Sequence, residues 1–496
     1  MKSPVRVEAP AVVTRRELLY GLTALAAGAS FAGCGGSGGA DTAAAPSGPA
    51  NPQLAPSGPT TAATLSISAT VAGTIAPAFA GLSYEKSSMA VPRFAPGNTD
   101  LIGMFTGLGP SLLRIGGNSV DETQWAPNGA GRTAGEVAPS DIDALAGFLD
   151  ACGWRVLYGV NLATSTPAAA AAEVAYAVQS LGASLYGIEI GNEPDLYGGH
   201  YFQSWTLADF EALWSEFRAA ILASAPGVTL TGPADAGNIA AWTIPFGEYA
   251  GQSQIALLTQ HYYRGNGQSA SSTDAELVSP DAALVSDLAA LAAGAAGIGV
   301  PFRLAETNSF YNGGAPGVSD SYASALWVID HLFTIALGGG VGANLHGGGD
   351  GDGYTPIADS NGTVVEARPE YYGTLLFTLA GTGTLLGTTL AAGGLNVTAY
   401  ALQPRAGLLS IVVVNKDAEQ TLDLSIDCGS PVSGATLIAL TGPALDASSG
   451  VAIQGAAVAV DGGFAPAAPY GLASSGNTLN CYVGALSAAL IQVGIG

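Results

Sequence analysis

The chain of 496 residues is too long for one ordinary core, so we expect a large domain together with a smaller one. Acidic residues outnumber basic residues 38 to 15, and the formal net charge of −23 excludes the basic surface that nucleic-acid binding requires. The same charge works against long-range attraction of polyanionic substrates.

The first 34 residues are predicted to be an export signal that takes no part in the fold. Arg15 and Arg16 precede an apolar run from Leu18 to Ala32, which is typical of a twin-arginine signal and short for a membrane-spanning helix. The signal ends in a sequence resembling a lipobox, so a lipid on Cys34 is the expected membrane attachment. The alternative is an ordinary cleaved signal in which Cys34 is incidental. The expected location is the periplasm or the cell surface.

Residues 35–61 are rich in Gly, Ser, Ala and Pro, which predicts a flexible linker. Residues 79–380 then alternate short apolar runs with helical patterns, the signature of βα units. Eight such units predict an α/β fold, a (β/α)8 TIM barrel. The alternative, an open doubly wound sheet, is disfavoured because no Gly-rich phosphate motif follows the first strand. The expected strands are Phe79–Tyr84, Leu112–Ile115, Arg155–Val160, Tyr186–Ile190, Val228–Leu230, Ala256–His261, Phe302–Ala305 and Ala343–His346, and the expected helices are Asp141–Ala151, Pro167–Leu181, Ala208–Ala223, Pro280–Ala296 and Asp320–Leu337.

Residues 381–496 change to short alternating runs separated by Gly, Ser, Pro and Asp, which predicts a C-terminal antiparallel β-sandwich. Residues 62–78 precede the first barrel strand and contain a similar run, Thr64–Val71. We expect that run to join the sandwich, which makes this domain discontinuous in sequence. The expected sandwich strands are Leu408–Asn415, Thr421–Ile426, Thr436–Leu440, Val451–Val460 and Ala485–Gln492.

The three cysteines beyond the signal have two expected fates. Cys428 and Cys481 both lie in the C-terminal region of an exported chain, so they are the expected disulfide pair. Cys152 ends a helical pattern and is expected to be a buried thiol. Neither their number nor their spacing suggests a metal site.

Two glutamates end strands of the predicted barrel. Glu193 follows the fourth strand and Glu306 follows the seventh, and the C-terminal strand ends of a barrel face its active site. A pair of carboxyl groups at one mouth suits glycosidic bond hydrolysis, in which one protonates the leaving oxygen and the other attacks the anomeric carbon or activates water. Separations of about 5–5.5 Å indicate retention, and wider gaps indicate inversion. Acid catalysis needs Glu193 protonated while Glu306 is ionised.

The sequence Gly191-Asn192-Glu193-Pro194, together with Glu306, resembles the clan of retaining (β/α)8 glycosidases. The resemblance implies that Glu193 is the acid/base, that Glu306 is the nucleophile, and that Asn192 binds the sugar 2-hydroxyl. This scheme requires no metal and no organic cofactor.

Within that clan, the chain resembles glycoside hydrolase family 79, the β-glucuronidases and heparanases, over about residues 62–496. The supporting stretches are residues 81–85, 113–119, 260–263 and 306–314. In the bacterial β-glucuronidases of that family, a Tyr and backbone amides after the nucleophile hold the substrate carboxylate, and the matching positions are Tyr311, Asn312 and Gly313. A phenol and amide N–H groups can bind one carboxylate without Arg or Lys, whatever the global charge. The alternative is that this loop is merely flexible.

Residues at other strand ends are further candidates for the substrate pocket. One residue of His261-Tyr262-Tyr263 could hydrogen-bond the nucleophile, and the clan resemblance favours Tyr263 or His261. Asn118 and His346, at the ends of the second and eighth strands, are candidate pocket residues.

Glu85, at the end of the first strand, could bind a sugar hydroxyl or could pair with Lys86 or Arg114. Arg114 is expected to orient the catalytic carboxylates from behind and to favour their ionised form.

The sequence therefore predicts a retaining exo-β-glucuronidase that releases terminal β-D-glucuronic acid from glycans or glycoconjugates by double displacement. Its partner would be a glucuronide-containing carbohydrate, with no nucleic acid. The first alternative is another retaining glycosidase of the clan, such as a β-glucosidase, a xylosidase or a heparanase-like endo-glucuronidase. A heparanase needs a basic cleft, which 15 basic residues make difficult. The non-enzyme alternative is a carbohydrate-binding surface lipoprotein, which the presence of both glutamates disfavours.

Overall fold

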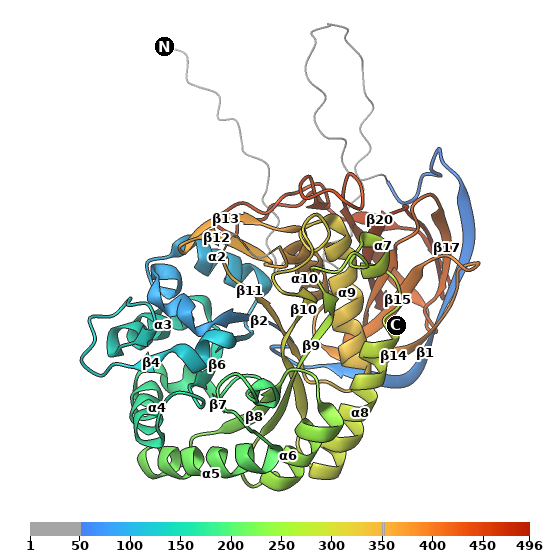
Figure 1. Cartoon of the computed structure of the whole chain (residues 1–496). Helices are drawn as coiled ribbons and strands as arrows, with labels where there is room; N and C mark the ends of the chain where they lie inside the picture. The colour runs from blue at the N-terminus through green and yellow to red at the C-terminus, as the bar shows by residue number, and fades with distance from the viewer. Residues whose placement is uncertain (1–50, 350, 352) are drawn as a thin grey trace, which may run out of the picture.

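The computed structural model describes residues 51–349, 351 and 353–496. The predicted export signal, Cys34 and most of the predicted linker lie outside these residues. The described chain forms a barrel and a smaller β-domain that lie side by side (Figure 1).

The barrel closes through eight parallel strands in the order β10-β11-β2-β3-β6-β7-β8-β9, which confirms the predicted fold class. Helices cover its outer face (Figure 1). Apolar side chains from strands and helices fill the space between the two layers. The strands are β2 (Ala80–Glu85), β3 (Leu112–Gly116), β6 (Arg155–Val160), β7 (Leu185–Ile190), β8 (Leu230–Asp235), β9 (Leu257–Asn266), β10 (Phe302–Tyr311) and β11 (Ala343–Gly347). The helices are α2 (Thr99–Leu108), α3 (Pro139–Cys152), α4 (Pro167–Leu181), α5 (Leu207–Ser224), α6 (Ile244–Ala250), α7 (Asp274–Leu277), α8 (Ala282–Ile298), α9 (Tyr322–Leu337) and α10 (Pro369–Ala380).

The smaller domain is one continuous sheet of eleven strands rather than two separate sheets. The sheet curls over so that alternate side chains of its strands enclose a second apolar core. Most neighbours are antiparallel, but β1 and β17 are parallel. The strands are β1 (Thr60–Ile75), β14 (Gly383–Ala391), β15 (Val397–Arg405), β16 (Leu408–Asn415), β17 (Thr421–Asp427), β18 (Val432–Thr441), β19 (Ala452–Ile453), β20 (Tyr470–Leu472), β21 (Ser474–Ser475), β22 (Thr478–Val483) and β23 (Ser487–Ile495).

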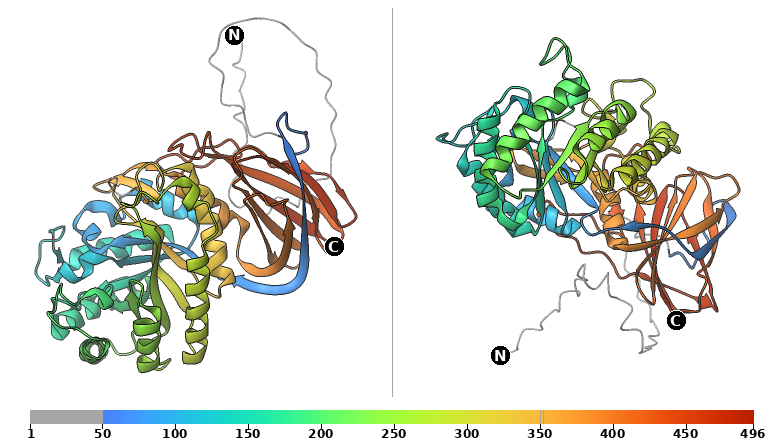
Figure 2. Two further views of the ribbon diagram at one scale, coloured as in Figure 1. Left: turned by 45° about the vertical axis from the view of Figure 1, so that its right-hand side comes forward. Right: turned by 90° about the horizontal axis from the view of Figure 1, so that it is seen from below.

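The long strand β1 runs through the smaller domain before the chain enters the barrel, between β14 and β17 (Figure 2). Residues 51–59, which the sequence assigns to the flexible linker, pack against the same sheet. The backbone N–H of Tyr482 donates to the carbonyl of Pro52 at 3.0 Å. The predicted linker is therefore wrong at its C-terminal end, because this stretch supplies hydrogen bonds that the edge of β22 lacks.

The two domains share one apolar core, which fixes their relative position. Side chains of β16 and β18, among them Val412 and Leu440, belong to the same buried cluster as the barrel helices α9 and α10. Polar contacts reinforce the interface. The Nζ of Lys416 is paired with Asp330 on α9, and Tyr322 donates to the carbonyl of Leu440 at 3.2 Å.

Three sequence expectations are wrong in the β-domain and the barrel. Cys428 and Cys481 are free, because β17 pairs with β22 so that Leu424, not Cys428, stands opposite Cys481. The predicted strand Val451–Val460 is a strand only at Ala452–Ile453. The fifth barrel strand extends to Asp235, beyond its predicted end at Leu230. Cys152 is a buried free thiol, as expected.

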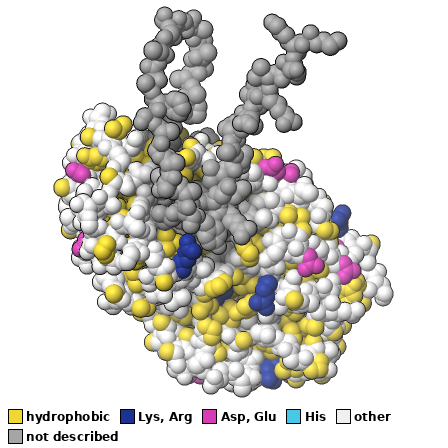
Figure 3. All heavy atoms as spheres, turned by 180° about the vertical axis from the view of Figure 1, so that it is seen from behind, with side chains coloured by type: hydrophobic (Ala, Val, Ile, Leu, Met, Phe, Trp, Pro, Cys, Tyr) yellow, Lys and Arg dark blue, Asp and Glu magenta, His cyan; other side chains and the backbone are white. Residues whose placement is uncertain are grey.

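By length and composition alone, the segment Asp274–Ile298 could cross a membrane. In the structure its main helix, α8, is an outer barrel helix that buries Leu284, Leu288 and Leu291 against β9 and β10. The rear face of the molecule carries few charged side chains among many small and apolar ones (Figure 3). Burial of these leucines accounts for part of the apolar character of α8.

Candidate active site

A cavity of about 900 Å³ opens at the C-terminal ends of the barrel strands. That volume lies at the upper end of the range for small-molecule sites, so the cavity has room for more than one sugar ring. No Lys or Arg is among its lining residues in the described chain. Those residues are Glu85, Asn118, Asp121, Glu122, Asn192, Glu193, Leu196, Tyr197, His200, Tyr201, Ala236, Tyr263, Glu306, Tyr311, Asn312, Gly313, His346 and Tyr354.

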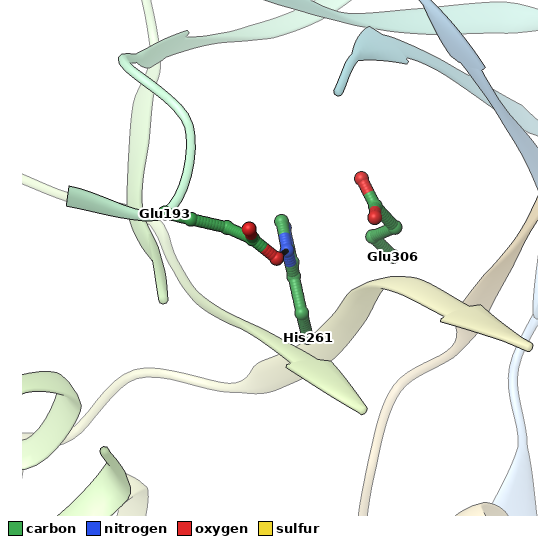
Figure 4. Close-up of side chains that lie close together, drawn as sticks. All are labelled: Glu193, His261 and Glu306. Atoms are coloured by element: carbon green, nitrogen blue, oxygen red, sulfur yellow. Dashed lines mark hydrogen bonds and ion pairs between the residues drawn. The ribbon is translucent and has the colours of Figure 1, made fainter. Parts of the chain in front are cut away.

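Glu193 stands in a backbone conformation that few residues adopt. Its φ of 50° and ψ of 52° place it in the left-handed region, directly before Pro194. Such a conformation costs about 1–3 kcal/mol and persists where the surrounding structure imposes it. Here the backbone N–H of Glu193 donates to the carbonyl of Ala234 at the end of β8 at 2.9 Å, which holds the turn. The turn aims the carboxyl group into the cavity (Figure 4).

Glu306 is aimed by an irregularity in the sheet. The register between β9 and β10 shifts between Leu304 and Glu306, so that Glu306 stands opposite His261. A shift of this kind re-aims the side chain that follows it. The carboxylate then accepts two hydrogen bonds, from the Tyr263 hydroxyl to Oε1 at 2.9 Å and from Nη1 of Arg114 to Oε2 at 2.7 Å. The sequence left Tyr263 and His261 as alternatives, and the structure gives this contact to Tyr263.

The Arg114 guanidinium is fully buried beneath the cavity and joins four acceptors, of which the Ser83 hydroxyl oxygen is the most distant at 3.4 Å. Besides Glu306, it donates to Oε2 of Glu189 at 2.6 Å and to Oδ1 of Asn192 at 2.9 Å. Since Arg can only donate, the Asn192 atom that faces it is the oxygen. The Asn192 amide N–H groups consequently face Asn118 and the cavity, where one can meet a sugar hydroxyl. Arg114 therefore makes contacts of the kind that its expected role, orienting the catalytic carboxylates, requires.

Charges around Glu306 outweigh its burial. Burial alone would raise the pKa of the Glu306 carboxyl, but His346, His261 and Arg114 hold that pKa well below its usual range, with help from the Tyr263 hydrogen bond. The pKa of Tyr263 is raised well above its usual value, chiefly by burial, so its hydroxyl stays a donor. Glu306 is therefore an ionised carboxylate, which is the state that a nucleophile requires.

His261 contacts the other glutamate. Its Nδ1 lies 2.9 Å from Oε1 of Glu193, and the ring lies between the two carboxyl groups (Figure 4). One carboxylate oxygen of Glu193, one of Glu306 and a ring nitrogen of His261 lie within 4.8 Å of one another. That spacing could admit a cation, but both oxygens of Glu306 already accept hydrogen bonds from Arg114 and Tyr263. The contact of Glu193 with a ring nitrogen suits proton transfer, and the two donors on Glu306 suit a carboxylate that attacks as a nucleophile.

Glu85 and His346 meet at the seam between the first and eighth barrel strands. Glu85 accepts hydrogen bonds from the backbone N–H groups of Asn118 and Ser119 at 3.1 and 2.8 Å. His346 Nε2 lies 3.6 Å from Glu85. The sequence alternative that Glu85 pairs with Lys86 or Arg114 is wrong, because the buried Lys86 binds Glu173 instead and Arg114 binds Glu189 and Glu306.

Tyr311, Asn312 and Gly313 line the cavity in the loop that follows β10. Asn312 and Gly313 both have positive φ, of 63° and 80°. Their backbone N–H groups have no acceptor within the described chain, whereas the carbonyl of Gly313 is held by the N–H of Gly353 at 2.8 Å. Successive free N–H groups in such a turn form a concave anion site. The exposed Tyr311 ring stands edge-on to Tyr263, which places its phenol beside the same cavity.

Several lining residues carried no recognised signal in the sequence. Asp121 is buried and accepts hydrogen bonds from the N–H groups of Leu162 and Asn192 and from the Tyr197 hydroxyl. Burial raises the pKa of its carboxyl. Leu196, His200 and Tyr201 come from the loop after Glu193, and Tyr354 comes from the segment after β11. Of these residues, only Leu196, His200 and Tyr201 could have been expected from the sequence, because their loop directly follows the strand end that carries Glu193.

No family model matches the chain. It is similar to a β-glucuronidase of Aspergillus niger, with 26% identity over 344 residues, which are 61% of this chain and 63% of that protein. It is also similar to a β-glucuronidase of Neurospora crassa, with 26% identity over 352 residues, which are 59% of this chain and 62% of that protein. The matched region thus spans under two thirds of the length of each of these relatives.

Solved structures share the fold over most of the chain. A 4-O-α-L-rhamnosyl-β-D-glucuronidase of Fusarium oxysporum superposes with a TM-score of 0.73 at 19% identity, covering 86% of this chain and 99% of that one. A family 51 arabinofuranosidase of Xanthomonas axonopodis pv. citri superposes with a TM-score of 0.64 at 16% identity, covering 87% of this chain and 100% of that one. At these identities the likeness concerns the architecture of barrel and β-domain.

Proposed function

We propose that the chain is a retaining exo-β-glucuronidase, a glycoside hydrolase that releases terminal β-D-glucuronic acid by double displacement. One observation carries the proposal: Glu193 and Glu306 line the same cavity as the loop residues Asn312 and Gly313, whose backbone N–H groups have no acceptor within the described chain. The names of the Aspergillus and Neurospora relatives support the same substrate class. Membership of glycoside hydrolase family 79 stays a prediction.

In the first step Glu193 donates its proton to the glycosidic oxygen while Glu306 attacks the anomeric carbon. The low pKa of Glu306 keeps it ionised, and Arg114 and Tyr263 hold both of its oxygens. One oxygen of Glu193 and one of Glu306 lie within 4.8 Å of each other, and this short approach supports direct attack, which uses carboxyl groups about 5–5.5 Å apart.

In the second step water hydrolyses the glycosyl-enzyme. Attack has by then converted the Glu306 carboxylate into a neutral ester, and Glu193, having lost its proton, serves as the base for water. Asn192 would hold the sugar 2-hydroxyl through its amide N–H during both steps, because Arg114 fixes the amide with its oxygen turned away.

The uronate carboxylate would be bound by the Tyr311 phenol and the N–H groups of Asn312 and Gly313. Each contact is a charge-assisted hydrogen bond, stronger than one between neutral groups. A glucoside or a xyloside cannot form these charge-assisted hydrogen bonds, and the lack of each one costs about 1.5–3 kcal/mol of binding relative to a glucuronide. This cost favours a glucuronide over the other clan substrates, and the absence of Lys and Arg from the described lining disfavours a sulfated polymer.

The experiment compares 4-nitrophenyl β-D-glucuronide with the matching glucoside and xyloside, with Glu306→Gln as the control. We expect kcat/KM for the glucuronide to exceed the others by at least about a hundredfold and the variant to be inactive. Faster turnover of the glucoside would show that residues 311–313 do not select for the uronate carboxylate. Full activity of Glu306→Gln would contradict the proposed mechanism. Folded wild-type protein that turns over none of the three substrates would favour the carbohydrate-binding alternative.

Proton NMR of the first product tests retention. The β-anomer of glucuronic acid should form first and then mutarotate, because two inversions at one carbon restore its configuration. An α-anomer as the first product would show single displacement. Release of the monosaccharide from oligosaccharides, rather than of internal fragments, checks exo action. Export and the lipid on Cys34 remain part of the proposal and rest on the sequence alone.

A further inference from the structure

The loop that follows Glu193 is a rigid element of the cavity wall. The Trp205 indole donates to the carbonyl of Pro194 at 2.8 Å, which ties the two ends of the loop together. Phe202 stacks on Trp205 with ring centroids 4.4 Å apart, and the N–H of Gly199 donates to the carbonyl of Phe202 at 2.6 Å. The position of the loop is thus fixed by its own packing.

This loop presents Leu196, His200 and Tyr201 to the cavity. Leu196 is 54% exposed, and the His200 and Tyr201 rings stand edge to face with centroids 4.3 Å apart. Exposed apolar and aromatic groups lining a cavity match the carbon-bound face of a sugar ring or an aryl group. The proposed chemistry at Glu193 and Glu306 uses none of these three side chains.

Carboxylates surround the same wall. Burial raises the pKa of the Tyr201 phenol to about 12, and the negative charges of Asp121, Glu122 and Glu85 contribute to that increase. The nearby guanidinium of Arg114 offers no compensation, because its donors bind Glu189, Glu306 and Asn192 below the cavity. An anion placed against Tyr201 would therefore meet like charges and no Lys or Arg among the lining residues that the structure describes, while the positive charge of His346 is directed at Glu85 and Glu306.

We propose that Leu196, His200 and Tyr201 form a second subsite that accepts an uncharged sugar or aryl unit joined to the uronate, and that Glu122 makes this subsite reject anionic units such as sulfated sugars. The inference rests on the proposed function, because it specifies which glucuronides that function reaches. The uronate itself escapes the rejection since it is held by the separate loop at Asn312 and Gly313.

The test uses two matched pairs of substrates, because the neighbouring unit can be joined at either end of the uronate. In the first pair, 4-carbamoylphenyl and 4-sulfophenyl β-D-glucuronide differ in the charge of the leaving group. In the second pair, a neutral hexose or its sulfate is linked to O4 of 4-nitrophenyl β-D-glucuronide. We expect kcat/KM to be about tenfold lower for the anionic member of at least one pair at low ionic strength. The end that shows the penalty is the end that faces Tyr201.

Two variants and one control test whether the lower kcat/KM of the anionic substrate depends on the proposed subsite. The ratio of kcat/KM for the neutral member to kcat/KM for the anionic member should fall about threefold in Glu122→Gln. Added salt should lower the same ratio in the wild type. Tyr201→Ala should raise KM for the neutral member by about tenfold while kcat changes less. Glu248→Gln removes an equal charge from the exposed surface of α6, away from the cavity, and should leave the ratio unchanged.

A ratio within twofold of one for both pairs overturns the proposal, and so does a ratio that Glu122→Gln and Tyr201→Ala leave unchanged. In either case turnover of the neutral glucuronides still supports the proposed function. Folded protein that turns over no glucuronide at all overturns the proposed function and the subsite with it.

Discussion

Nδ1 of His261 lies 2.9 Å from Oε1 of Glu193, in a ring that is almost completely buried. The second ring nitrogen, Nε2, has no partner in the described chain. Because His261 occupies Oε1, the other oxygen of Glu193 is the one free to protonate a leaving group. His261 is therefore a positioning residue that decides which carboxyl oxygen faces the substrate.

Replacing His261 by Ala should impair catalysis most for substrates whose leaving group must be protonated. We expect kcat to fall about a hundredfold for an alkyl glucuronide, whose leaving group must be protonated, and about tenfold or less for 4-nitrophenyl glucuronide. Steady-state kinetics on the two substrates measures the difference. Equal losses on both would indicate general disruption of the site, and His261→Asn, which keeps a donor near Glu193, should recover part of the activity.

Tyr263→Phe removes one of the two hydrogen bonds to Glu306. Since hydrogen bonds to a charged group contribute about 1.5–3 kcal/mol, kcat should fall about tenfold to a hundredfold. Loss of this donor raises the pKa of Glu306, and the active form is ionised. The acid limb of the kcat/KM profile should therefore move to higher pH. Tyr262→Phe is the matched control, since its hydroxyl donates outward to Asp281 at 2.8 Å. An unmoved acid limb in Tyr263→Phe would contradict the role given to this hydrogen bond.

The buried Asp235 is expected to be a neutral carboxylic acid. The Gln260 amide nitrogen donates to the carbonyls of Asp235 and His261, so Gln260 turns its oxygen toward Thr243. The hydroxyl oxygen of Thr243 lies 2.5 Å from that oxygen and 2.9 Å from Oδ2 of Asp235, and it carries a single hydrogen. Both contacts can be hydrogen bonds only if Asp235 supplies a proton. Burial and the neighbouring Asp195 also raise the pKa of Asp235 well above its usual value.

Asp235→Asn should consequently stabilise the protein as the pH rises. A raised pKa in the folded state means that stability is complete below the unfolded pKa and is lost as pH increases toward the folded pKa. The variant has no such loss, so its Tm advantage should grow between about pH 5 and pH 8, by about 1 °C for each kcal/mol relieved in a protein of this size. Thermal unfolding at several pH values measures it. A Tm below wild type at every pH would mean that Asp235 is ionised in the fold.

Lys416→Met should weaken the attachment of the β-domain to the barrel. The Nζ of Lys416 is buried and paired with Asp330 on α9, which also accepts from Thr398. Removing one partner leaves a poorly compensated charge at the interface, which typically costs about 3–5 kcal/mol. Urea unfolding should show that loss. Arg132→Met, which removes an exposed cation, should change stability by less than about 0.5 kcal/mol.

The barrel and its catalytic pair could be predicted because their signals are local. Strand ends carry Glu193 and Glu306, and helix α4 begins and ends at the predicted residues, Pro167 and Leu181. Strand β8 continues to Asp235 through Gly232-Pro233, a dipeptide of the kind that usually marks a turn, which makes its true end hard to predict from the sequence. The hydrogen-bond partner of each side chain was harder to predict. Nothing in the spacing of His261 and Tyr263 indicates which glutamate each contacts, since the register shift before Glu306 decides it.

Pairings between distant segments lay beyond the sequence for a different reason. The expected Cys428–Cys481 bond fails by strand register, which depends on how β17 and β22 align. Asp121 enters the cavity only because the loop after β3 folds against the loop after β7, where Tyr197 contacts it. Such contacts result from the closed barrel and have no counterpart in local periodicity.

Strand β1 has a consequence for the order in which the chain can fold. Thr61, near its start, is hydrogen-bonded to Gln420, which lies 359 positions further along the chain. A ribosome therefore makes the first strand of the β-domain long before the strands that flank it, and the intervening barrel must emerge in the meantime. Until β14 and β17 arrive, β1 exposes two unpaired edges that invite wrong partners. Contacts so distant in sequence also slow folding. The last quarter of the polypeptide thus supplies both neighbours of the first strand, and deleting it would leave β1 without a partner on either side.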